Sequence, residues 1–284
     1  MKTDGLFKFV SLGTLWVWLF VFALIPNLMV VAASFMTRGV EDFLAPVISL
    51  SSYARLLDPL YLGVLWNSCY LAALTTLLCL LMGYPFAFLL TRASRRLRPL
   101  LLLLVVIPFW TSSLVRTYAM VIILKSKGVL NEALLAAGLI DEPLELLYTD
   151  TAVLLGLIYA LLPFMVLPLY AALEKLDGRL IEAARDLGAG GFQVFIRIIL
   201  PLTMPGVIAG GILVFLPALG LFYIADILGG AKSLLVGNLI RDQFLAVRDW
   251  PFGAAASVML TLLMGLLLWV YHLSARHADQ RTLT

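Results

Sequence analysis

Long apolar runs separated by short polar stretches dominate the pattern along this chain. Six of them contain about 20 or more residues, the length that a helix needs to cross the hydrocarbon core of a bilayer. They lie at roughly 11–36, 64–91, 99–124, 151–173, 202–228 and 254–275. The stretches between them are too short to fold around a core of their own. The pattern predicts an all-α integral membrane protein with about six transmembrane helices, forming a single transmembrane domain over residues 1–284.

The composition indicates the same class. Hydrophobic residues make up 62% of the chain and charged residues 13%, against roughly 45–50% and about 25% in soluble domains. The formal net charge of +3 decides nothing about partners. We expect membrane lipid around this chain and no nucleic acid.

The first apolar run has two interpretations, because it follows basic residues as a secretory signal does. Its apolar stretch of about 25 residues exceeds the 7–15 residues of a signal core. We therefore expect it to remain as the first transmembrane helix.

Basic residues are distributed unequally between the two sides of the predicted six-span arrangement. Positively charged loops tend to stay in the cytoplasm, and one side holds the larger group: Lys2, Lys8, Arg92, Arg95, Arg96, Arg98, Lys175, Arg179, Arg185, Arg197, Arg276 and Arg281. Both termini are thus predicted to be cytoplasmic. Most acidic residues fall on the outer side, among them Glu132, Asp141 and Glu142, where they either attract cationic ligands or are simply solvated.

A polar segment, residues 174–201, interrupts the apolar pattern between the fourth and fifth runs. Leu180, Ala183, Ala184 and Leu187 recur at helical spacing and form one apolar stripe. The glycines of LGAGG then predict a tight turn. A second amphipathic run, FQVFIRII, follows, and we expect Pro201 to end it.

The spacing of residues in this segment carries a resemblance. Glu-Ala-Ala is followed after three residues by Gly, and after nine more by Ile-x-Leu-Pro, with the matching positions Glu182, Ala183, Ala184, Gly188, Ile198, Leu200 and Pro201. This resembles the EAA motif of bacterial ABC-importer permeases. The resemblance implies the type I (MetI-like) permease fold, and a cytoplasmic coupling loop over 174–201 that docks on an ATPase.

Nucleotide chemistry is expected elsewhere. The chain contains no G-x-x-x-x-G-K-[ST] phosphate-binding loop. We therefore expect no cofactor in this chain, and ATP and Mg²⁺ to be used by the partner ATPase.

The resemblance extends from about Ile25 to about Tyr271 and narrows the family. Stretches such as GYPFAFLL, LLPFMVLPLYAALEKLD, GLFYIADILGGAK and RDWPFGAA are similar to permease subunits of spermidine/putrescine importers. This implies a multi-pass protein of the bacterial inner membrane. The implied partners are a homologous second permease, a cytoplasmic ATPase dimer and a periplasmic polyamine-binding protein.

Two charged residues inside the apolar runs are candidates for the substrate pathway, since charge within a membrane span defaults to a functional hypothesis. Arg116 and Asp226 fall toward the outer ends of the third and fifth runs. One interpretation pairs them as a structural ion pair. In the other, Asp226 binds a substrate ammonium group, and Arg116 tunes its carboxylate or is displaced from it.

Aromatic residues extend this candidate pathway. Phe222 and Tyr223 precede Asp226 by four and three residues, and Trp110 and Tyr118 lie in the third run. Ring faces attract ammonium groups, although aromatic residues near span ends also form the interfacial belt.

Other functions stay open. An intramembrane enzyme needs a catalytic constellation, and the runs contain neither a His/Asp/Glu cluster nor G-x-S-x-G or H-E-x-x-H motifs; we expect no catalytic residue and no metal site. An autonomous channel would need no ATPase. Among importers, the motif does not separate polyamines from putrescine alone, iron or sulfate.

Overall fold

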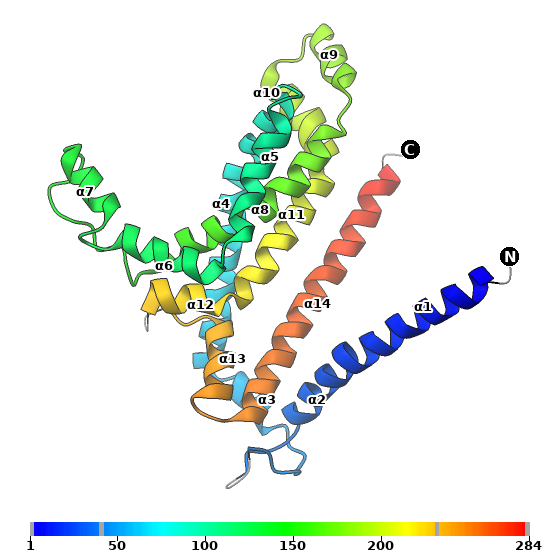
Figure 1. Ribbon diagram of the computed structural model, residues 1–284, viewed down its shortest axis with the longest axis vertical. Helices are drawn as coiled ribbons and strands as arrows, with labels where there is room; N and C mark the ends of the chain where they lie inside the picture. The colour runs from blue at the N-terminus through cyan, green and yellow to red at the C-terminus, as the bar shows by residue number, and fades with distance from the viewer. Residues whose placement is uncertain (1–2, 40–42, 231–232, 282–284) are drawn as a thin grey trace. The chain divides into compact units, whose positions relative to one another are not determined.

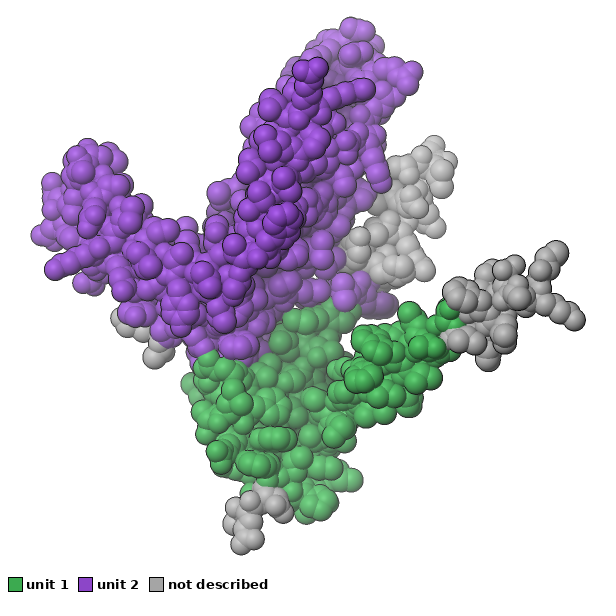
Figure 2. Space-filling model, in the orientation of Figure 1, with its two compact units in different colours: residues 1–63, 239–265 green, residues 64–238, 266–284 purple. Residues whose placement is uncertain are grey.

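The computed structural model describes residues 3–39, 43–230 and 233–281 (Figure 1). The chain divides into two compact units, residues 1–63 with 239–265, and residues 64–238 with 266–284 (Figure 2). Each unit is described by itself. The single transmembrane domain expected over residues 1–284 stays a prediction.

The first unit contains the N-terminal span. It consists of α1 (Thr3–Leu19), a π-helical turn (Phe20–Leu24) and α2 (Ile25–Ser34). Its membrane-spanning part, Ser11–Ser34, has none of its most apolar window buried within the structure. At its end, the Ser34 and Tyr53 hydroxyls form a hydrogen bond of 2.7 Å, which ties the span to α3 (Ser51–Leu56).

An ion pair organises the rest of this unit. Arg55 Nη1 donates to Asp249 Oδ2 at 2.8 Å, and the carboxylate also accepts the Phe252 N–H at 3.3 Å. Asp249 thereby caps α14 (Trp250–Arg281). The hydrogen bond that Arg55 donates to Asp249 is the main reason that the pKa of Arg55 lies above its ordinary value.

Two helices form the centre of the second unit, α8 (Asp150–Glu174) and α11 (Leu200–Gly220). They approach closely because glycines of α11 face α8: a Cβ at Gly206 would lie 2.5 Å from the Ala172 Cβ, and one at Gly210 would lie 2.7 Å from the Met165 sulfur. Small residues at such crossings let helix backbones pack tightly in a membrane. The remaining long helix is α4 (Pro59–Arg92).

The predicted spans are confirmed for the most part. Among the described residues, five helices are long and apolar enough to cross a membrane: Ser11–Ser34, Pro59–Arg92, Asp150–Glu174, Gly191–Gly220 and Trp250–Trp269. A bent pair brings the number to six if it is one span. Within the described ranges there is no strand, only an isolated bridge between Thr37 and Ala45.

The third predicted span, 99–124, is not one helix. It consists of α5 (Arg98–Val106), a 3₁₀ turn (Ile107–Trp110) and α6 (Ser113–Leu124). The two halves, Arg98–Trp110 and Ser113–Ala136, are bent by 95°. Pro108 cannot donate a helical hydrogen bond, and Thr111 and Ser112 adopt extended backbone angles. The second half also includes α7 (Val129–Ala136).

The fifth predicted span, 202–228, has different limits at both ends. The helix runs over Gly191–Gly220, so the expectation that Pro201 ends the run before it is wrong. A π-helical turn, Phe195–Ile199, precedes the proline, and such wide turns occur inside continuous helices. At the other end the helix stops at Gly220; after Leu221, α12 (Phe222–Ile224) and a π-helical turn (Ala225–Gly229) follow.

Candidate functional site

The predicted coupling loop, residues 174–201, is called the coupling segment below. It forms the helix and glycine turn that its sequence predicts. α9 spans Gly178–Asp186, and the Asp177 carboxylate accepts the Arg179 N–H at its start. At its end, Ala189 N–H donates to Ala184 O and Gly188 N–H to Arg185 O, at 3.0 and 2.9 Å. This pair of bonds is a Schellman motif. Gly188 has a φ of +82°, a conformation that favours glycine.

The coupling segment exposes apolar side chains. Leu187 is 89% exposed and Phe192 is 77% exposed, and Glu182 is exposed as well. Large apolar side chains that stay exposed outside the membrane spans fit a protein–protein contact.

The motif residues do not form one cluster. Glu182, Ala183 and Ala184 lie on α9, and Gly188 in the turn. Ile198, Leu200 and Pro201 lie beyond α10 (Gly191–Val194), at the start of the long helix that contains α11. The motif therefore includes both the exposed helix and the base of the span that follows it.

A polar cavity of about 480 Å³ lies in the second unit where the broken helices meet. α6, α8 and the end of α11 contribute to its wall, and the lining residues are Phe109, Thr111, Ser112, Ser113, Arg116, Ala160, Leu161, Phe164, Pro217, Leu221 and Tyr223. The hydroxyls of Ser113 and Tyr223 form a short hydrogen bond. The cavity thus gathers hydroxyl groups and one cation, with no carboxylate among its lining residues.

Arg116 is the charged residue of this cavity. Its guanidinium carbon lies 5.7 Å from the centre of the Tyr159 ring, a cation–π geometry. Its Nε is buried without a hydrogen-bond partner among the described residues. The ion pairs between described residues do not include one between Arg116 and Asp226.

Asp226 is held by a residue that the sequence analysis missed. Asn238, at 2% exposure, donates from Nδ2 to Asp226 Oδ1 at 2.5 Å and to the Phe222 carbonyl at 3.0 Å. Its own Oδ1 accepts the Leu235 N–H at 3.3 Å. Asn238 lies in α13 (Val236–Leu245). The one sequence signal for this buried amide is the single Asn in the otherwise apolar run LLVGNLI.

Of the four aromatic candidates, Tyr223 lines the cavity. Trp110 and Tyr118 are 77% and 59% exposed, and neither lines it. Phe222 and Tyr223 both belong to α12, and of these two it is Tyr223 that reaches the cavity. The structure therefore brings together Arg116 and Tyr223 in one cavity, and Phe222 and Asp226 at the Asn238 amide.

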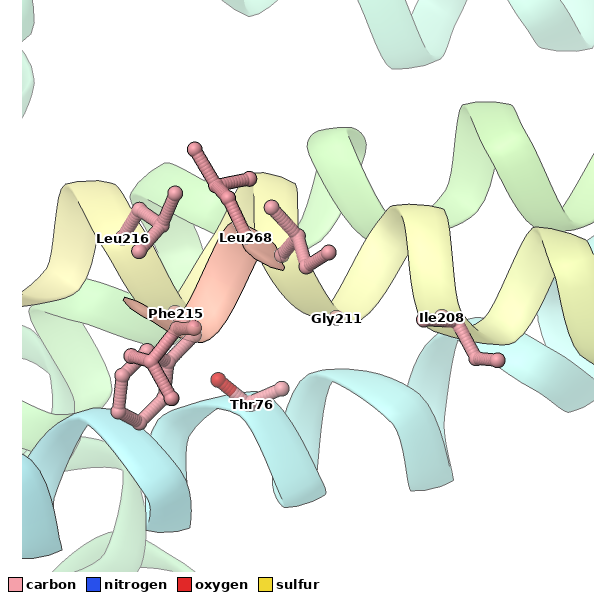
Figure 3. A pocket seen from close by; sticks show the side chains of 8 residues that line it. Thr76, Ile208, Gly211, Phe215, Leu216 and Leu268 are labelled. Atoms are coloured by element: carbon pink, nitrogen blue, oxygen red, sulfur yellow. The ribbon is translucent and has the colours of Figure 1, made fainter. Parts of the chain in front are cut away.

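A second hollow in the same unit has a different character (Figure 3). It has a volume of about 290 Å³ and lies between α4, α11 and the middle of α14. Its lining is aliphatic and aromatic apart from Thr76, whose hydroxyl donates to the Ala72 carbonyl at 2.7 Å. It contains no group that would bind a charged solute. Elsewhere in the described residues, no three His, Cys, Asp or Glu side chains are grouped to hold a metal ion.

Comparison with known proteins identifies the family. The sequence family described as "binding-protein-dependent transport system inner membrane component" matches residues 80–284. The chain belongs to this family. It is therefore a multi-pass inner-membrane transport subunit rather than an enzyme.

Individual relatives are similar over nearly their whole length. The chain is 54% identical over 281 residues to the spermidine/putrescine transport system permease protein PotB of Salmonella typhimurium strain LT2, covering 99% of this chain and 98% of that protein. It is 56% identical over 264 residues to PotB of Escherichia coli K12, covering 93% and 96%.

A solved structure confirms the fold. The bacterial alginate ABC transporter, crystallised with an alginate pentasaccharide-bound periplasmic protein, superimposes with a TM-score of 0.78 over 98% of this chain and 96% of that one. The two sequences are 20% identical. The type I (MetI-like) permease fold predicted from the sequence is thus confirmed.

Proposed function

We propose that this chain is the permease subunit of an ATP-driven importer of spermidine and putrescine. The observation that supports this most is the identity of 54–56% to PotB proteins over nearly the full length. The inner-membrane location agrees with the family.

The pathway in this proposal runs past the polar cavity and the Asp226 segment. A polyamine carries several ammonium groups, which carboxylates and aromatic ring faces attract. Asp226, Phe222 and Tyr223 offer such groups, and Trp110 and Tyr118 are further candidates. Arg116 repels a polycation, so its place in the cavity requires counter-charge nearby. Asp226 and carboxylates of a homologous second permease are the proposed sources.

The energy source in this proposal is a cytoplasmic ATPase dimer that binds ATP and Mg²⁺. The exposed surface of α9 and the glycine turn, with Glu182 and Leu187, is its proposed docking site. Docking there requires α9 to face the cytoplasm. In the six-span arrangement, both termini then face the cytoplasm as well. A periplasmic polyamine-binding protein delivers the substrate on the opposite side.

Uptake in a polyamine-auxotrophic host tests the function. The host carries the whole assembly, with or without this subunit, and accumulation of labelled spermidine and putrescine is measured. We expect uptake only when the subunit is present. Equal uptake without it, or import of sulfate or iron in place of polyamines, contradicts the proposal. ATPase activity of the purified assembly, stimulated by polyamine-loaded binding protein, is the second measurement.

A further inference from the structure

Arg98, the first residue of α5, contacts the ends of two other helices. Its Nη2 donates to the Thr91 carbonyl, in the last turn of α4, at 2.6 Å. Its Nη1 donates to Oε1 of Glu174, the last residue of α8, at 3.2 Å. One guanidinium therefore joins α4, α5 and α8 at the end of the second unit that carries the coupling segment.

The partner carboxylate is held from its own helix as well. The Tyr170 hydroxyl donates to the same Glu174 oxygen at 2.8 Å. The Arg98 and Glu174 side chains are 28% and 47% exposed, and ion pairs this accessible contribute little to stability. The Thr91 carbonyl belongs to the last turn of α4, where an arginine is favourable. The arrangement is thus better suited to fixing geometry than to holding the fold together.

This joint lies directly against the coupling segment. A cavity of about 220 Å³ is lined by Arg98 and Glu174 together with Gly178, Ile181 and Ile199 of the coupling segment. Arg98 Nε is buried without a hydrogen-bond partner among the described residues. An unmet buried donor is costly, and the cavity beside it gives room to move. The Arg98 side chain therefore has room to move together with the helices that it connects.

We propose that Arg98 and Glu174 are positioning residues for energy coupling, which transmit movement of the coupling segment to α4 and α5. The inference rests on the proposed function, because an ATPase must move the segment. Glu174 is the last residue of α8 and the first of that segment, and Arg98 is its link to the neighbouring helices. Arginine suits this position because its planar fork reaches two acceptors at once, which the single ammonium of lysine does not.

The test measures ATP hydrolysis and spermidine uptake by the whole importer in liposomes, and their ratio. In Arg98→Gln, we expect the ATPase to remain bound, and uptake per ATP hydrolysed to fall about fivefold, within the range of coupling variants. Arg98→Lys keeps the charge but loses one of the two contacts, so its ratio should lie between those of Arg98→Gln and the unchanged protein.

Arg95 provides a matched control in the connection between α4 and α5. Its side chain is exposed, and it takes part in none of the ion pairs between described residues. Arg95→Gln should therefore leave the ratio within about twofold of the unchanged value. The exchange Arg98→Glu with Glu174→Arg restores an ion pair without the Thr91 contact, and we expect it to recover the ratio in part.

Several results overturn the inference. They are an unchanged ratio in Arg98→Gln, an equal fall in Arg95→Gln, or an exchange variant no better than Arg98→Gln. If both Arg98 single variants fail to assemble, Arg98 has a structural role only. An unchanged subunit that retains no ATPase contradicts the proposed function itself, and this is seen before any variant is compared.

Discussion

The buried amide of Asn238 donates to the Asp226 carboxylate at 2.5 Å, across twelve residues of chain. The same amide nitrogen holds the Phe222 carbonyl at 3.0 Å. These bonds fasten the short segment after the α11 break to the start of α13. A carboxylate fixed in this way presents its charge in a defined direction, which is what selective binding of an ammonium group needs.

Exchanging these two residues separates charge from structure. Asp226→Asn alone removes the carboxylate but keeps the shape, so we expect normal assembly and reduced polyamine uptake. Asn238→Ala deletes all three hydrogen bonds of the Asn238 side chain and should lower the free energy of unfolding by about 1–3 kcal/mol, measured by thermal denaturation of the purified complex.

The double variant Asp226→Asn with Asn238→Asp keeps an amide–carboxylate bond but moves the charge. It also loses the donor to the Phe222 carbonyl, so we expect it to assemble with a somewhat lower melting temperature and to transport poorly at subsaturating polyamine. Full uptake in the double variant would mean that only the bond matters. Full uptake in Asp226→Asn would remove Asp226 from the pathway.

The turn at Gly188 should tolerate a substitution only if the new residue can adopt a positive φ, because there is room for a larger side chain. Gly188 has a φ of +82° and no heavy atom within 4 Å of an added Cβ. Gly188→Val should therefore strain the turn by about 2 kcal/mol, and reduce co-purification of the ATPase while the protein still inserts. Gly190→Ala is the control, because Gly190 has equally open surroundings and an ordinary φ of −67°. Equal loss in both variants would contradict this account.

Close packing of α8 and α11 gives a stability prediction. Gly206→Ala places a Cβ 2.8 Å from the Pro168 carbonyl oxygen, which belongs to backbone and cannot rotate away. We expect a loss of about 1–3 kcal/mol, seen as a lower melting temperature in detergent. Gly211→Ala meets its nearest atom at 3.8 Å and should leave the melting temperature unchanged. A drop of the same size in both would mean that helix flexibility, and not contact, decides.

The sequence predicts this fold well wherever one local signal determines an element. Hydropathy finds the spans, and helical spacing followed by glycine finds α9 and the turn at Gly188. Hydropathy does not register backbone direction, so it joined α5 to α6 across Thr111 and extended the fifth span past Leu221. The role of Asn238 was out of reach, because its partners Phe222 and Asp226 meet it only after the chain has turned back.

The orientation of the chain is the remaining prediction, and labelling of single cysteines tests it. The native Cys69 and Cys79 are replaced first, of which Cys79 is buried and Cys69 partly so. A cysteine at Arg96, in the basic connection between α4 and α5, should react with an impermeant thiol reagent only from the cytoplasm. A cysteine at Glu142, in the acidic connection that follows α7, should react only from outside. The helices on either side of the break after Trp110 are bent by 95°. This pair can therefore either cross the membrane or turn back within it. If that pair returned to the side from which it entered, both positions would label from one face, and the six-span arrangement would be wrong.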